Sequence, residues 1–159
     1  IGNAETMSAA EGSFISSAYW TEGIGPAAAV ATIEKMSRLD VPGQLARIGD
    51  LLCKGWTELG KEHGLPVTIG GRPEMVLIGF DHADANALMT LFTTRMLDHG
   101  FLASGGFNPT MAHEPSHVER YLEAAGGVFV EIGESMEHND VMQRIGGRPK
   151  HTMFARLTD

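Results

Sequence analysis

The run Met75-Val76-Leu77-Ile78 is apolar at every position, and it constrains the fold more than any other stretch of this 159-residue chain. With Phe80 it has the length of a strand, and a strand without polar alternation is typical of one that is covered on both faces. Val67-Thr68-Ile69 precedes it across a Gly70-Gly71-Arg72-Pro73 turn. The two runs therefore predict a pair of neighbouring strands.

Segments with apolar residues at helical spacing surround these strands. They are Pro26 to about Leu39, the residues after the Val41-Pro42-Gly43 break to about His63, about Asp84 to His99, and Glu114 to about Ile132. Gly64 and Gly100 are expected to end two of them. Phe101-Leu102-Ala103 is expected to be a short strand, followed by a glycine-rich loop at Ser104–Asn108. We therefore predict an α+β unit in which a short, mostly antiparallel sheet packs on helices.

Composition and charge exclude several classes of function. The net charge is −8 and the basic residues never form a run, which argues against nucleic-acid binding. No apolar run approaches 18 residues and no signal peptide begins the chain, so we expect neither a membrane nor a secreted protein. The single cysteine, Cys53, fits a reducing compartment, and we expect a cytoplasmic protein with a buried, inert thiol. Because Ile1 is not a methionine, we expect the start to be a cut.

The segment from Ser16 to Ala29 has the features of an anion site. Its Gly-Ile-Gly turn leads into Pro26, a residue suited to a first helical turn, and then into an alanine-rich helix. The start of such a helix presents N–H groups and the positive end of the dipole. Hydroxyls at Ser16, Ser17 and Thr21 add donors, so this turn is expected to bind a phosphate.

The same segment, Tyr-Trp-Thr-Glu-Gly-Ile-Gly-Pro-Ala-Ala-Ala, resembles the one that follows the cofactor lysine in class III aminotransferases. These are fold-type-I pyridoxal-phosphate enzymes that include glutamate-1-semialdehyde aminomutase. The resemblance continues through Gly100–Ser104, Ala112-His113 and Phe154–Thr158. It implies that Thr21, with the main chain at Trp20, binds the phosphate of pyridoxal phosphate across the interface of a homodimer.

The resemblance also implies a division of the chain. Residues 1–40 would be the end of the large α/β cofactor-binding domain, and residues 41–159 a connecting helix with the carboxy-terminal small domain. The loop Ser104–Asn108 would face the substrate, a small amine or oxo acid, through Ser104, Phe107 and Asn108. Some relatives have an arginine at the position of Ser104, and the aminomutases a glutamate at that of Asn108; this chain has neither.

The lysine required for the Schiff base has no counterpart in this chain. The four lysines, Lys35, Lys54, Lys61 and Lys150, all lie outside the sequence context of the cofactor lysine, which would precede Ile1. We therefore expect a carboxy-terminal fragment of an aminotransferase, without catalytic residues of its own and inactive alone. An aminomutase is one alternative, and a non-catalytic fragment that self-associates is another.

Two further motif matches lack the context that their chemistry needs. His113-Glu114-Pro115-Ser116-His117 matches the H-E-x-x-H zinc pattern, but Pro115 places His113 before the helix, so we expect no metal site. Gly23–Ala28 matches the dinucleotide fingerprint G-x-G-x-x-A, which must leave a buried strand and meet an acidic strand end about twenty residues later. That later region is predicted to be helical. Only the phosphate-binding interpretation remains.

Overall fold

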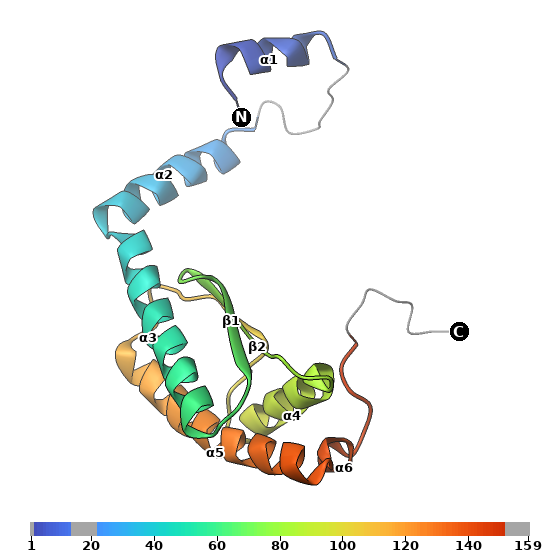
Figure 1. The fold of residues 1–159 in the computed structure, drawn as a ribbon. Helices are drawn as coiled ribbons and strands as arrows, with labels where there is room; N and C mark the ends of the chain where they lie inside the picture. Colours follow the sequence, from blue (N-terminus) through green and yellow to red (C-terminus); the bar gives the residue numbers. More distant parts are fainter. Residues whose placement is uncertain (1, 14–21, 152–159) are drawn as a thin grey trace. The chain divides into compact units, whose positions relative to one another are not determined.

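A computed structural model describes residues 2–13 and 22–151 of the chain (Figure 1). It divides the chain into two compact units, Ile1–Leu39 and Asp40–Asp159. The assignment of the first unit to a cofactor-binding domain stays a prediction. Among the described residues, no helix combines the length and the hydropathy that a membrane crossing requires.

The first unit contributes two helices, α1 (Ala4–Glu11) and α2 (Ile24–Arg38). α2 begins two residues before Pro26, because Ala27 N–H already donates to the Gly23 carbonyl at 3.0 Å. Pro26 still lies in the first turn, where its missing N–H breaks no helical hydrogen bond. Neither helix buries a residue.

The second unit contains an antiparallel sheet, as predicted, and its strand order is β1-β2-β3. Its strands are β1 (Val67–Arg72), β2 (Met75–Phe80) and β3 (Gly106–Phe107). β1 is longer than predicted, because Gly70 and Gly71 pair with Leu77 and Val76 instead of forming the turn. The turn is therefore only Pro73 and Glu74.

The third strand is not where the sequence predicted it. Phe101 N–H donates to Met96 O at 2.8 Å and Ala103 N–H to Phe101 O at 2.9 Å, so these groups are used locally. Pairing occurs instead at Phe107, opposite Val76, within the segment expected to be a loop. The position of the third strand therefore depends on which backbone N–H and C=O groups are still free to pair, and side-chain patterns do not show this.

Helices α3 (Val41–Glu62), α4 (Ala85–Asp98), α5 (Pro115–His138) and α6 (Val141–Ile145) complete the second unit. Gly64 and Gly100 follow α3 and α4 with φ of +63° and +83°, which confirms their predicted role as helix stops. α5 continues six residues beyond the predicted end at Ile132, and α6 was not predicted.

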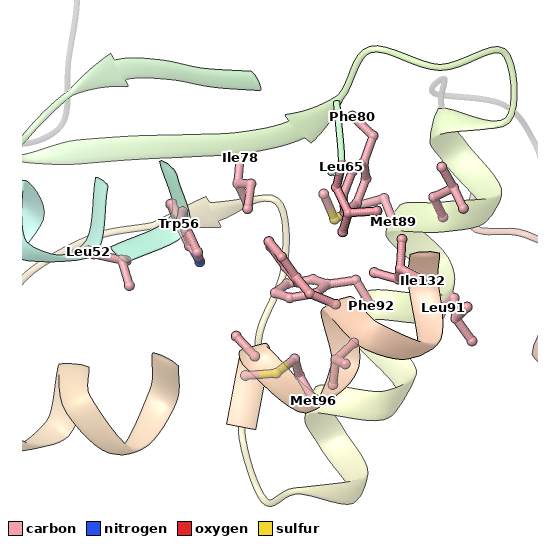
Figure 2. Close-up of a cluster of buried hydrophobic side chains, with 14 of the residues drawn as sticks. Leu52, Trp56, Leu65, Ile78, Phe80, Met89, Leu91, Phe92, Met96 and Ile132 are labelled. Atoms are coloured by element: carbon pink, nitrogen blue, oxygen red, sulfur yellow. The ribbon is translucent and has the colours of Figure 1, made fainter. Parts of the chain in front are cut away.

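One contiguous core holds the second unit together (Figure 2). Its fully buried large apolar side chains come from α3, β2, α4 and α5: Trp56, Phe92, Phe129, Ile48, Leu52, Leu88, Leu91, Met96, Ile132, Val76 and Val128. On β2, Val76 and Ile78 point into this core, while Met75 and Leu77 remain 57% and 48% exposed. The expectation that both faces of the apolar run are covered is therefore wrong for the described residues, which cover one face only.

Candidate functional site

A cavity of about 200 Å³ lies between the loop that follows α4 and the start of α5. It is lined by Phe101, Leu102, Ala103, Ser104, Gly106, Phe107, His113 and Tyr121. A second cavity of about 100 Å³ shares Phe101, Phe107, His113 and Tyr121 with the first, and it extends to His117. We call these two adjoining cavities together the aromatic pocket, because they share four lining residues.

The loop on one side of the aromatic pocket is held in place by backbone and side-chain hydrogen bonds. Gly105 O accepts from Ile78 N–H at 2.9 Å, and Phe107 pairs with Val76 in the sheet. Ser104 Oγ both accepts from Gly106 N–H and donates to Gly106 O, each at 3.2 Å. The loop is thus attached to the sheet, and Phe107 has a fixed position.

Two histidines form the opposite side, and each uses the same ring nitrogen to hold the backbone. His113 Nδ1 accepts from Thr110 N–H at 2.9 Å, and His117 Nδ1 accepts from Glu114 N–H at 3.1 Å. In the neutral ring the hydrogen is then carried by Nε2, which becomes the donor. The side-chain nitrogen of Gln44 in α3 also donates to His113 O at 3.0 Å and ties this segment to the core.

The H-E-x-x-H segment has the local structure that the sequence predicted. Pro115 is the first residue of α5 and Glu114 is its N-cap, so His113 precedes the helix. The two imidazole rings nevertheless lie 6.4 Å apart, nearly perpendicular to each other. The described residues contain no group of three or more side chains that could hold a metal ion.

Tyr121 lines both cavities of the aromatic pocket. Its ring contacts Phe101 edge to face at 5.5 Å and Trp56 at 6.1 Å. Burial raises the pKa of the Tyr121 phenol well above its usual value, because the phenolate would lose its hydration. The hydroxyl therefore stays protonated over the range in which enzymes work.

The structure brings together two of the three residues predicted to face the substrate. Ser104 and Phe107 line the aromatic pocket, whereas Asn108 is exposed and is not part of its lining. The predicted phosphate residues Trp20 and Thr21, with Ser16 and Ser17, lie outside the described residues. The roles of all these residues stay predictions.

The four lysines are exposed, and none lines the aromatic pocket. Lys54 lies 3.9 Å from Glu58 on the surface of α3. Cys53 is half-buried rather than buried, and burial, with Asp50 nearby, raises the pKa of its thiol. A raised thiol pKa agrees with the prediction of an unreactive cysteine.

Sequence reasoning missed most of the pocket. Phe101 was expected in a strand, and His117 was considered only as a zinc ligand. The available signal was the clustering of these aromatic side chains on both flanks of the glycine-rich loop.

The chain is similar in sequence to one known protein and in fold to another. The chain is 36% identical over 109 residues to 2'-deamino-2'-hydroxyneamine transaminase of Streptomyces kanamyceticus. That match covers 67% of this chain and 27% of the transaminase. The fold is similar to that of the FumI protein of Sphingopyxis sp. MTA144, solved in its PLP internal aldimine form, with a TM-score of 0.75 and 21% identity. The resemblance to pyridoxal-phosphate aminotransferases is confirmed.

The structural match covers 86% of this chain and 34% of the FumI chain. The chain therefore spans between about a quarter and a third of the length of these two proteins. At this level of identity the structural likeness supports the fold, and the predicted α+β architecture is confirmed. No family model matches the chain.

Proposed function

We propose that this chain is the carboxy-terminal part of a pyridoxal-phosphate aminotransferase of class III, which transfers an amino group between an amine or amino acid and an oxo acid. One observation carries the proposal: a sequence relative and a structural neighbour agree on the same chemistry. The relative is a transaminase, and the neighbour binds PLP. The small share of both proteins that the chain spans fits a role as one part of the complete enzyme.

The start of α2 fits the phosphate of the cofactor. The N–H groups of Ile24 and Gly25 have no partner within the helix, because the helical ladder begins with Ala27. They lie at the positive end of a 15-residue helix that has no acidic residue in its first turn. In the proposed homodimer, these groups and Thr21 hold the phosphate of the partner's cofactor.

When bound, pyridoxal phosphate supplies an electron sink that makes the hydrogen on the amine-bearing carbon acidic. The residues of this chain position the reactants. The aromatic pocket holds the part of the substrate that does not react. The lysine that forms the Schiff base with the cofactor comes from another part of the same protein. Asn108, exposed beside the pocket, is proposed to contact the substrate as well.

Covalent trapping tests this assignment. The chain and a version extended by the upstream coding sequence are each incubated with pyridoxal phosphate, reduced with borohydride, and mapped by peptide mass spectrometry. We expect specific attachment only in the extended protein, at a lysine that precedes Ile1. Stoichiometric attachment at Lys35, Lys54, Lys61 or Lys150 would show that the fragment interpretation is wrong.

The aminomutase alternative has less support. The relative is a transaminase, and the glutamate of aminomutases has no counterpart at Asn108. A non-catalytic fragment that self-associates remains the alternative from another class. It predicts no amino transfer by the extended protein with any amine and oxo-acid pair.

A further inference from the structure

The aromatic pocket has the chemistry of a subsite for a hydroxylated ring. We propose that it binds the hydroxylated six-membered ring of an amino sugar or a similar cyclic amine, which places the amine outside the pocket for transfer. The inference rests on the proposed function and names the substrate class of that enzyme. It assigns His113 and His117 as substrate-binding residues.

The first argument is the shape of the walls. The Phe107 and His113 rings meet at 5.0 Å with an angle of 59° between their planes, which makes a corner of two aromatic faces. Phe101 and Tyr121 complete the recess. Aromatic faces carry negative charge density, and the C–H groups on one face of a saturated, hydroxylated ring are positively polarised. The C–H face of such a puckered ring can therefore pack against these aromatic side chains.

The second argument is the supply of hydrogen-bond donors. Because Nδ1 of His113 and of His117 is occupied by a backbone N–H, each ring offers Nε2–H to a ligand. Among the described residues, no hydrogen bond is found at either Nε2. Both histidines are half-buried in the lining, so an oxygen acceptor on a ligand would replace the water that these donors otherwise bind.

The third argument is charge. None of the described residues that line the two cavities is Asp, Glu, Lys or Arg. A carboxylate placed here would lack a counter-ion, whereas neutral hydroxyl groups need only the imidazole donors. The transaminase relative is named for a hydroxylated neamine derivative, which agrees with this preference.

Binding of glucosamine to the chain as it stands, observed by NMR, tests the proposal without cofactor or turnover. We expect saturable shifts of the His113 and His117 ring signals and saturation transfer from protein to the ring C–H protons. Cyclohexylamine, a ring of the same size without hydroxyls, and glutamate, which carries carboxylates, are the comparison ligands. Equal or tighter binding of either one would overturn the proposal, as would the absence of saturable shifts with glucosamine.

Two substitutions at one position separate ligand binding from structure. H113N keeps an acceptor where Nδ1 meets Thr110 N–H but lacks the Nε2 donor, and H113Q keeps a donor near Nε2 but loses that acceptor. We expect H113N to weaken glucosamine binding roughly two- to tenfold, the range of one neutral hydrogen bond, and H113Q to weaken it less. The surface variant Lys54→Ala is the control and should bind as the unmodified chain does. Unchanged binding by H113N would contradict the proposal.

The two proposals fail in different ways. If the extended protein transfers amino groups but neither it nor the chain binds glucosamine, the ring subsite is wrong and the proposed function stands. If the chain binds the ring through His113 and the extended protein attaches no cofactor, the aminotransferase assignment is wrong.

Discussion

The two units of this molecule form helices for different reasons. In the first unit, α2 exposes its apolar residues Val30, Ile33 and Met36, by 57%, 64% and 40%. In the second unit, α5 buries Phe129 and Ile132 completely. α2 is rich in alanine, so local propensity favours it, whereas α5 tolerates two adjacent glycines because packing stabilises it.

This difference shows which unit carries the stability. A 15-residue helix that buries no residue is marginal in water by itself, so α2 gains little stability from packing. The second unit has a complete core and should fold by itself. Four measurements test this comparison, from the largest expected effect to the smallest.

The largest effect should follow removal of an aromatic side chain from the core. Phe129 is fully buried and meets Phe80 and Phe92 edge to face at 6.2 and 6.1 Å. We expect Phe129→Ala to lower the free energy of unfolding by about 3–5 kcal/mol in urea titrations. Ile33→Ala in the first unit should change it by less than about 0.5 kcal/mol. Comparable losses would mean that the first unit is packed in solution.

Glycine substitutions sharpen the comparison within helices of the second unit. A Cβ at Gly49 in α3 would lie 1.7 Å from the backbone oxygen of Pro73, so the helix and the hairpin turn would have to separate. We expect Gly49→Ala to lower the free energy of unfolding by about 1–3 kcal/mol or more.

Gly127 in α5 is the matched control, because a Cβ there meets nothing within 4 Å. Gly127→Ala should raise the free energy of unfolding by up to about 1 kcal/mol, since alanine loses less conformational entropy in a helix. In the same thermal or urea experiment, we expect Gly49→Ala to lower the free energy of unfolding and Gly127→Ala to raise it. A neutral Gly49→Ala would show that α3 does not approach the turn this closely.

A smaller effect concerns the reactivity of Cys53. Burial and the Asp50 carboxylate raise the pKa of this thiol, so its reactive thiolate forms only at higher pH than in the unfolded chain. The rate of alkylation by iodoacetamide should therefore rise with pH later in the native protein than in urea. Asp50→Asn should move the native profile towards lower pH. Coincident native and unfolded profiles would contradict the described burial.

The smallest effect is expected from removing the first unit altogether. A chain of residues 40–159 retains the whole core, so its urea midpoint should equal that of the complete chain within error. A clear loss of stability or of cooperativity would show that the first unit packs on the second. The comparison drawn above would then be wrong.

Much of the local structure could be predicted from residue patterns. The stripes of α3, α4 and α5, the positive-φ glycines after α3 and α4, and the start of α5 at Pro115 all follow from spacing and capping. Apart from the end of α5 and the short α6, the errors lie in the sheet. β1 extends through Gly70 and Gly71, and β3 forms at Phe107, because strand pairing depends on where the opposite strand offers N–H and C=O groups.

The candidate site was only partly predictable for the same reason. Ser104 and Phe107 could be chosen from the glycine-rich loop and the family resemblance. His113 and Tyr121, from the next segment and the second turn of α5, join them through the pairing of β3 and the packing of α5 on α3. No spacing rule connects residues that are brought together by the packing of different elements.

The amino-acid sequence by itself determined the four long helices, the glycine stops after α3 and α4, the aminotransferase resemblance and the lack of a lysine in the context of the cofactor lysine. Only the tertiary structure decided which face of β2 is covered and which side chains line the aromatic pocket. It also decided which nitrogen of each pocket histidine is available to a ligand. Helix periodicity and caps are encoded within a few neighbouring residues, whereas burial, pairing and a ligand pocket arise from contacts between residues far apart in the chain.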